Sequence, residues 1–186
     1  MRFIHSLSFP ALLFSAMAYA KASSSDPFQI YGYGTGIGGA QLFSSGGSTY
    51  FGDYQLANDS EAAPVVFTPS NNVWLGSPNS TVFDDTNTTL PDWSNYTFSV
   101  PSSGSSSHDV SFISSSSDSS NVITTGFTFY GTFIFVTGTS GNLESLFYAL
   151  PTDTDGIYKL KWNTTGDDTD DKILLTLKKT PPSSSK

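Results

Sequence analysis

Downstream of residue 27 the chain is a series of short apolar runs in which hydrophobic and polar positions alternate. The segment Tyr96-Thr-Phe98-Ser-Val100 alternates clearly, as does Val110-Ser-Phe112. A period of two is typical of a strand that buries one face. We therefore expect strands at 28–33, 40–43, 49–51, 65–68, 73–75, 96–100, 110–112, 127–130, 132–136, 143–150, 157–162 and 173–177.

Turn-forming residues separate these runs, as in Ser44-Ser-Gly-Gly-Ser48, which predicts a hairpin turn. After residue 22 no window keeps apolar residues at helical spacing over three turns. The pattern predicts an all-β domain, either an antiparallel β-sandwich or a closed barrel, since both bury the alternating faces and limit open edges. A similarity between 28–32 and 127–131 leaves a pseudo-symmetric, β-trefoil-like barrel as an alternative.

The first twenty residues have the pattern of a secretory signal peptide. Arg2 precedes an apolar stretch from Phe9 to Met17, and Ala18-Tyr-Ala20 fits a cleavage site, as does a cut after Ala22. The apolar stretch is too short to cross about 30 Å of hydrocarbon. We expect a secreted protein of the extracellular space or cell wall, with no membrane attachment once the signal is removed.

The rest of the chain is expected to form one domain. Residues 21–27 are expected to be a flexible lead-in, 28–179 the all-β domain, and 180–186 a disordered tail. Within the domain, the segment 101–120 holds 12 Ser, which predicts a solvated loop.

Charge and composition exclude several functions. Without residues 1–20 the chain has 7 Lys, no Arg and 16 acidic residues, a net charge of −9. Nucleic-acid binding depends on Lys and Arg, so we expect none. The absence of Cys excludes disulfides, thiolate nucleophiles and Cys-type metal sites. We expect no cofactor: Gly34-Thr-Gly36-Ile-Gly38-Gly39 matches a dinucleotide motif, but no helix follows, and a tight or bulged strand connection explains it.

No residue is assigned as catalytic, and we favour a protein that is not an enzyme. The one histidine outside the signal, His108, lies between Ser107 and Asp109, whereas the members of a catalytic triad converge from separate segments. A glycosidase needs two facing carboxylates. Glu144 is the best candidate for that role, although alternation already explains it as an outward-facing strand residue.

The acidic segment Asp167-Asp168-Thr-Asp170-Asp171 is a weak candidate for calcium, which binds carboxylate oxygens in irregular loops. A solvated acidic turn that keeps strand edges soluble is the preferred interpretation, because the spacing specifies no coordination geometry. We therefore assign no metal site.

Aromatic residues are the best candidates for ligand binding. Outside the signal there are 12 Phe, 8 Tyr and 3 Trp. Most should lie in the core, but Tyr or Trp rings exposed on a sheet can stack on sugar rings without any catalytic group. The candidates are Tyr31, Tyr33, Trp74, Trp93 and Trp162.

Five N-x-S/T sequons fit a secreted protein and predict glycosylation in loops or at solvent-facing strand positions. Their asparagines are Asn58, Asn79, Asn87, Asn95 and Asn163.

Three segments together resemble a group of small secreted fungal cell-surface proteins of uncharacterised function. They are Ile30-Tyr-Gly-Tyr-Gly-Thr-Gly-Ile-Gly-Gly39, Tyr50-Phe-Gly-Asp53 and Leu146-Phe-Tyr-Ala-Leu-Pro-Thr-Asp-Thr-Asp-Gly-Ile-Tyr158. The resemblance implies a fungal source and an extracellular location, and no activity.

The leading hypothesis is a glycosylated, non-enzymatic extracellular or cell-wall protein that contacts polysaccharide through exposed aromatics. The alternatives are a secreted carboxylate-dependent glycoside hydrolase and a secreted effector that binds a host protein. The effector hypothesis predicts a contiguous apolar surface free of sequons.

Overall fold

The computed structural model describes residues 26–83, 90–114 and 120–183. Within these ranges the chain forms strands and two short 3-10 helices, η1 (Tyr54–Ala57) and η2 (Ser80–Val82), and no helix in them is long and apolar enough to cross a membrane. The prediction of an all-β domain is confirmed. The strands are β1 (Tyr31–Gly34), β2 (Ile37–Ser45), β3 (Ser48–Phe51), β4 (Ala63–Ser70), β5 (Val73–Pro78), β6 (Tyr96–Pro101), β7 (Ser111–Ile113), β8 (Val122–Ile123), β9 (Phe127–Tyr130), β10 (Phe133–Thr137), β11 (Leu143–Glu144), β12 (Phe147–Pro151), β13 (Tyr158–Trp162), β14 (Ile173–Leu174) and β15 (Thr176–Lys178).

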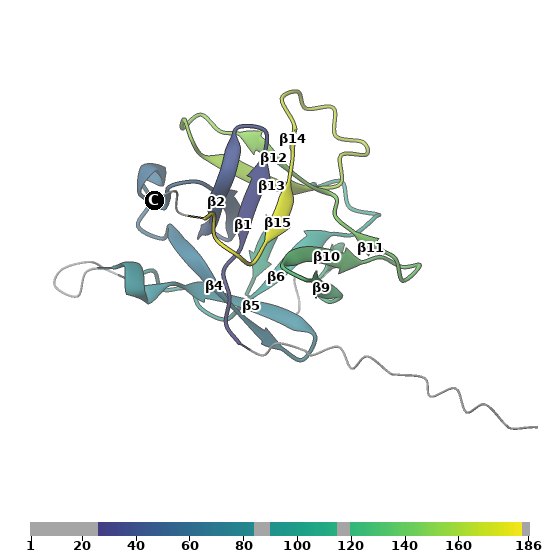
Figure 1. The fold of residues 1–186 in the computed structure, drawn as a ribbon, viewed down its shortest axis with the longest axis horizontal. Coiled ribbons are helices and arrows are strands. Elements are labelled where there is room, and N and C mark those ends of the chain that lie inside the picture. The colour runs from purple at the N-terminus through teal and green to yellow at the C-terminus, as the bar shows by residue number, and fades with distance from the viewer. Residues whose placement is uncertain (1–25, 84–89, 115–119, 184–186) are drawn as a thin grey trace, which may run out of the picture.

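Six antiparallel strands close into a barrel (Figure 1). Going round it, β2 pairs with β4, then β5, β6, β7 and β3 follow, and β3 pairs back with β2. The short contact between β3 and β7, where Ser48 lies opposite Ser111, completes the ring. Of the two predicted architectures the structure therefore has the closed barrel, which leaves its six strands without a free edge.

All six barrel strands come from residues 37–113. A pseudo-symmetric, β-trefoil-like barrel would draw strands from each repeat. The segment 127–131, proposed as a repeat of 28–32, instead forms β9, which lies outside the barrel ring. The β-trefoil-like alternative is therefore wrong.

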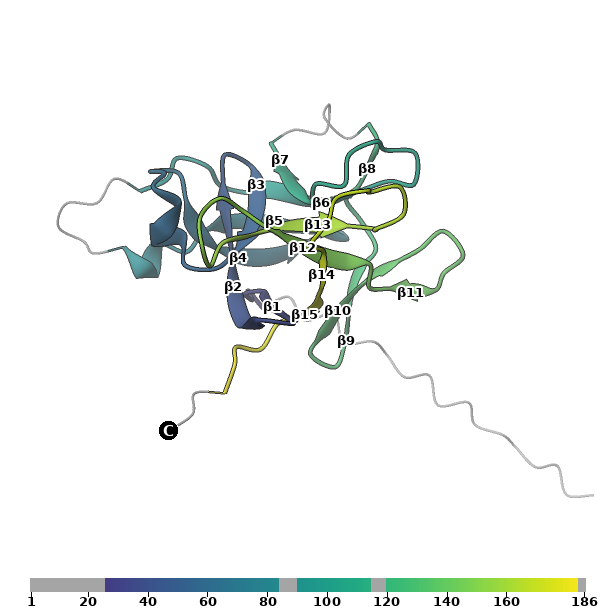
Figure 2. The ribbon, with the colours of Figure 1, turned by 90° about the horizontal axis from the view of Figure 1, so that it is seen from above.

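Two groups of strands extend the barrel (Figure 2). One continues from β2 through β1, β15 and β10, with β9 and β11 both paired to β10. We call these five strands the side sheet. The other continues from β3 through β13 and β12 to β14. The second half of the chain thus builds surfaces around a barrel made by the first half.

Aromatic rings fill the barrel. Phe67 is fully buried and its ring centroid lies 5.3 Å from that of Phe28, 5.3 Å from Phe98 and 5.7 Å from Phe112. Trp74 packs against the same group with its centroid 6.3 Å from Phe67. Burial of such large apolar side chains is the main force that holds a domain without disulfides.

Two glycines explain local features of the strands. Gly36 has a φ of 77° and makes the turn between β1 and β2, and the register of that pair shifts at Gly32–Tyr33. The glycine run is therefore the tight, bulged connection expected from the sequence. At Gly76 in β5, a Cβ atom would lie 2.8 Å from Cζ of Phe112, so the barrel interior has no room for a side chain there.

The strand expected at 110–112 is present as β7, which closes the barrel from within the Ser-rich segment 101–120, and Val110 and Phe112 are buried on either side of Ser111. Two other strand predictions need correction. The segment 143–150 divides into β11 and β12, which belong to different sheets. Likewise 173–177 divides at buried Leu175, since β14 pairs with β12 and β15 pairs with β1.

Candidate functional site

The side sheet carries a row of aromatic residues on its outer surface. Cross-strand partners in an antiparallel sheet point to the same face. The register places Tyr31 opposite Lys178, Lys178 opposite Phe133, and Phe133 opposite Tyr130. Tyr33 and Phe135 lie two residues along β1 and β10 and share that face. We call this set the aromatic face: Tyr31, Tyr33, Tyr130, Phe133, Phe135 and Lys178.

The opposite face of the same strands packs on the core. Leu177 is fully buried and Ile134 is 1% exposed. On the outer face, by contrast, Tyr130 is 71% exposed and Phe133 is 40% exposed, while Tyr31, Tyr33 and Phe135 are half-buried. The side sheet therefore has apolar residues on both faces, although one face meets solvent.

Lys178 lies in the middle of the row. Its Nζ is 4.6 Å from the ring centroid of Tyr33 and 4.9 Å from that of Phe133. An ammonium group at this distance is attracted to the negative face of an aromatic ring. Lys178 therefore holds two rings in place while supplying a hydrogen-bond donor.

The two tyrosines of β1 are fixed by their hydroxyl groups. Tyr31 donates a hydrogen bond to Oε1 of Gln29 at 2.8 Å, and Tyr33 donates to the backbone oxygen of Thr180 at 3.0 Å. Burial raises the pKa of Tyr31, and the neighbouring Tyr33 raises it further. Tyr31 thus stays a neutral hydroxyl, able to donate as well as accept hydrogen bonds at physiological pH.

The size and chemistry of the aromatic face suit an extended ligand. Three strand spacings of about 4.8 Å separate Tyr31 from Tyr130, so the row is about 14 Å long. It offers ring faces for apolar contact, phenol groups, and one ammonium, with no carboxylate in the set. Such a surface can stack against flat rings and hydrogen-bond to hydroxyl groups.

The three tryptophan candidates do not lie on an accessible surface. Trp74 is 5% exposed, Trp93 6% and Trp162 4%. Trp74 stacks on Phe127, and Trp162 packs edge-on against Phe147. Their large apolar area is buried in the core, so the expectation that they bind ligand is corrected. Tyr31 and Tyr33 are the two sequence candidates on the aromatic face.

Sequence reasoning missed Tyr130, Phe133, Phe135 and Lys178. In 132–136 both alternating sets are apolar, because Phe133 and Phe135 interleave with Ile134 and Val136. Such a segment predicts a strand buried on both sides. The signal that could have revealed the outer face is Tyr130 next to the exposed turn at Gly131, together with the adjacent lysines 178 and 179.

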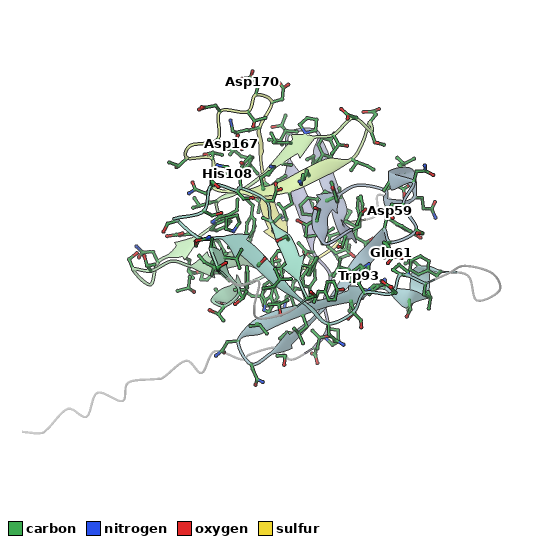
Figure 3. The ribbon with its side chains drawn as sticks, turned by 180° about the vertical axis from the view of Figure 1, so that it is seen from behind. Asp59, Glu61, Trp93, His108, Asp167 and Asp170 are labelled. Carbon is green, nitrogen blue, oxygen red and sulfur yellow. The ribbon has the colours of Figure 1, made fainter. Side chains whose placement is uncertain are left out.

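His108 is held by the backbone (Figure 3). Its Nδ1 is 2.7 Å from the carbonyl oxygen of Asn163 and 3.3 Å from that of Trp162. Since a carbonyl oxygen can only accept, Nδ1 carries the hydrogen. The neighbouring Ser107 hydroxyl accepts a hydrogen bond from the backbone N–H of Asp109. These contacts define a loop anchor.

Glu144, the candidate for a hydrolase, is half-buried in β11 and its carboxylate lies against Gly138 in the turn of its own hairpin. It pairs in register with Val136, whose side chain faces the core. The expectation that Glu144 faces outward is therefore wrong, and its position is that of a packed hairpin residue.

Asp109 takes part in both ion pairs found among the described residues. Its Oδ2 lies 2.9 Å from Nζ of Lys159, and its Oδ1 lies 2.5 Å from Nζ of Lys161. Burial alone raises the pKa of Asp109, but the hydrogen bonds and charges of Lys161 and Lys159 outweigh it and leave the pKa below the ordinary value. This group ties the loop before β7 to β13.

The acidic loop after β13 uses its first carboxylate internally. Asp167 accepts a hydrogen bond from the hydroxyl of Tyr148 and another from the backbone N–H of Thr169. Desolvation raises the pKa of Asp167, but these hydrogen bonds outweigh it and leave the pKa below its ordinary value. Asp170 lies at a distance from Asp167 in Figure 3, and no three acidic or histidine side chains among the described residues gather as metal ligands. The arrangement lends the calcium hypothesis for Asp167, Asp168, Asp170 and Asp171 no support.

The described sequons lie between strands. Asn58 and Asn95 are exposed, and Asn79 and Asn163 are half-buried. Asn58 follows η1, Asn79 precedes η2, Asn95 precedes β6 and Asn163 follows β13, so none of these four is on the side sheet. Asn87 lies outside the described residues. Glycans at the four described positions would start from loops and leave the side-sheet strands unmodified.

Comparison with protein-family models, with curated proteins and with solved structures found no match.

Proposed function

We propose that this chain is a secreted, N-glycosylated, non-enzymatic protein of the extracellular space or cell wall that binds polysaccharide through the aromatic face. One observation carries the proposal: side chains from four strands, Tyr31, Lys178, Phe133 and Tyr130, form a continuous row on a solvent-facing sheet surface. Nothing in core packing requires exposed rings at these positions.

The arrangement favours a sugar polymer over a small enclosed ligand. A sheet face is open at both ends of the row, so a chain longer than the row can lie across it. The apolar face of a pyranose ring packs on aromatic rings, and its hydroxyl groups can bond to the phenols and to Lys178. Because the aromatic face lacks carboxylates and carries one ammonium, a neutral polysaccharide such as chitin, β-glucan or cellulose fits better than a polycation.

Co-sedimentation with insoluble chitin, β-glucan and cellulose tests the proposal. We expect retention on at least one of them, and loss of that retention in Tyr130→Ala/Phe133→Ala. Leu174→Ala is the matched control, because Leu174 is 73% exposed and lies on β14, outside the side sheet. Failure of the parent protein to sediment with any of the three polymers would remove the polysaccharide from the proposal.

One observation also favours the effector alternative. The aromatic face is apolar and the described sequons lie elsewhere, as a protein-binding surface requires. Sedimentation of the parent protein distinguishes the two functions: polysaccharide binding predicts retention on at least one polymer, whereas a host-protein surface predicts retention on none.

A further inference from the structure

A hollow lies at one end of the barrel, where the β2–β3 turn meets the starts of β4 and β6 and the end of β7. Its volume is about 340 Å³ and its lining includes Trp93, Tyr96, Phe112, Glu61 and Asp92. Figure 3 shows Glu61 and Trp93 beside each other. We call this the barrel-end hollow.

Aromatic rings and fixed hydrogen bonds shape the hollow. The ring centroid of Trp93 lies 6.0 Å from that of Phe112 and 6.3 Å from that of Tyr96. The indole N–H of Trp93 donates to the backbone oxygen of Glu61 at 2.9 Å, and Oε2 of Glu61 accepts from the backbone N–H of Asp92 at 3.1 Å. The walls are therefore held in place by the fold itself.

The lining combines ring surface with carboxylate acceptors and contains no basic residue. A ligand that fits must offer an apolar face to the rings and hydroxyl or amide hydrogens to Glu61 and Asp92. An N-acetylated sugar ring has these groups, and it needs no charge of its own.

A glycosylation sequon lies beside the hollow. The sequon Asn95-Tyr-Thr97 has Trp93 two residues before its asparagine and Tyr96 directly after it, so two lining residues flank Asn95. Asn95 is exposed, has a φ of 56°, and its backbone N–H donates to Oγ of Ser77 at 3.0 Å. The attachment point is thus accessible and its backbone is fixed.

We propose that the first N-acetylglucosamine of a glycan on Asn95 docks in the barrel-end hollow, against the half-buried ring of Tyr96, and stabilises this end of the barrel. The proposal rests on the glycosylation included in the proposed function and is independent of polysaccharide binding. It makes Asn95 a structural glycosylation site, in contrast to sequons whose glycans extend into solvent.

A thermal cycle on the full chain tests the docking. In protein secreted from a eukaryotic host, Asn95→Asp should lower the melting temperature by about 2–4 °C, the shift that one moderate packing interaction gives in a domain of this size. The same substitution in unglycosylated protein from bacterial cytoplasm measures how far the changed side chain itself shifts the melting temperature. That shift is subtracted from the one measured in the glycoprotein. Asn163→Asp is the matched control, since Asn163 has a φ of 59° and lies outside the hollow lining.

Tyr96→Ala keeps the sequon and removes one wall of the hollow. In that background the glycan-dependent shift should disappear. Nuclear Overhauser contacts between the N-acetylglucosamine and the rings of Tyr96 or Trp93 in the parent glycoprotein provide a second measurement that needs no variant. The docking is overturned if Asn95 is unmodified in the secreted protein or if the shift persists without Tyr96. Loss of sedimentation with polysaccharide would leave every one of these outcomes unchanged.

Discussion

At the scale of single residues, Asp109 concentrates ion pairing at one position in a chain with 8 basic residues. Two of them, Lys159 and Lys161, converge on its carboxylate from alternate positions of β13. The aspartate is partly exposed, with 37% of its side chain accessible, so water weakens each pair. The group nevertheless links the loop before β7 to the strand beside β3.

Replacing Asp109 should destabilise the protein in a pH-dependent way. We expect Asp109→Asn to lower the free energy of unfolding by about 1–2 kcal/mol at pH 7, a figure discounted for solvent exposure. Because the pKa in the folded state lies below the ordinary value of 3.8, the stabilisation is complete above that value and is lost as pH falls through the folded pKa.

Urea unfolding of both proteins at pH 7 and at pH 3 measures this effect. The difference between parent and Asp109→Asn should shrink at the lower pH. An equal difference at both values would show that the carboxylate charge is not responsible.

The exposed rings allow a separation of binding from stability. Tyr130→Ala/Phe133→Ala should weaken polysaccharide binding about tenfold or more, since each aromatic contact contributes about 0.5–1.5 kcal/mol beyond its area. The melting temperature should change by less than about 2 °C, because surface substitutions are usually within about 0.5 kcal/mol. Binding isotherms and thermal melts of the same preparations check both, and a loss of binding that follows a loss of folding would contradict the assignment.

At the scale of elements, β5 depends on a strand position without a side chain. Gly76→Ala should lower the free energy of unfolding by about 1–3 kcal/mol, because the new methyl group must displace the ring of Phe112 inside a packed barrel.

Gly38→Ala is the matched control for Gly76→Ala. Gly38 is also a strand glycine with ordinary φ, and a Cβ there meets open space. We expect this variant to unfold within about 0.5 kcal/mol of the parent in urea. Equal effects of the two substitutions would show that loss of glycine flexibility, and not overpacking, sets the cost.

The strand pattern could be predicted from the sequence because alternation and turn residues are local signals. The pairing could not. Closure of the barrel depends on Ser48 meeting Ser111 across 62 intervening residues, and alternation says nothing about partners so far apart. The division of 173–177 at Leu175 has the same origin, since two different sheets compete for one apolar segment.

The candidate site was predictable in part. The sequence indicates Tyr31 and Tyr33 as aromatic candidates. Their neighbours Phe133 and Tyr130 belong to a hairpin about 100 residues away, and only the register of β1, β15, β10 and β9 brings them together. The tryptophans were poor candidates because the largest apolar side chains gain most from burial in the barrel.

At the scale of the whole molecule, the charge of the chain bears on how polysaccharide binding depends on salt. Binding to a neutral polymer through stacked rings involves few charges, so sedimentation should change less than about twofold between 50 mM and 500 mM NaCl. Phosphorylated or sulfated polymers should be bound no better than neutral ones, because the net charge of −8 repels them. A steep fall in retention with added salt would mean that Lys178 and Lys179 dominate recognition.

The order in which the chain supplies its strands has a consequence for biosynthesis. Residues 37–113 contain every barrel strand. Lys178, at the centre of the aromatic row, is on β15, which is synthesised last and lies between β1 and β10. A nascent chain stopped before Thr176 would retain all the strands for a closed barrel and still lack the middle of the row. Ligand capture would therefore distinguish finished molecules from prematurely terminated ones.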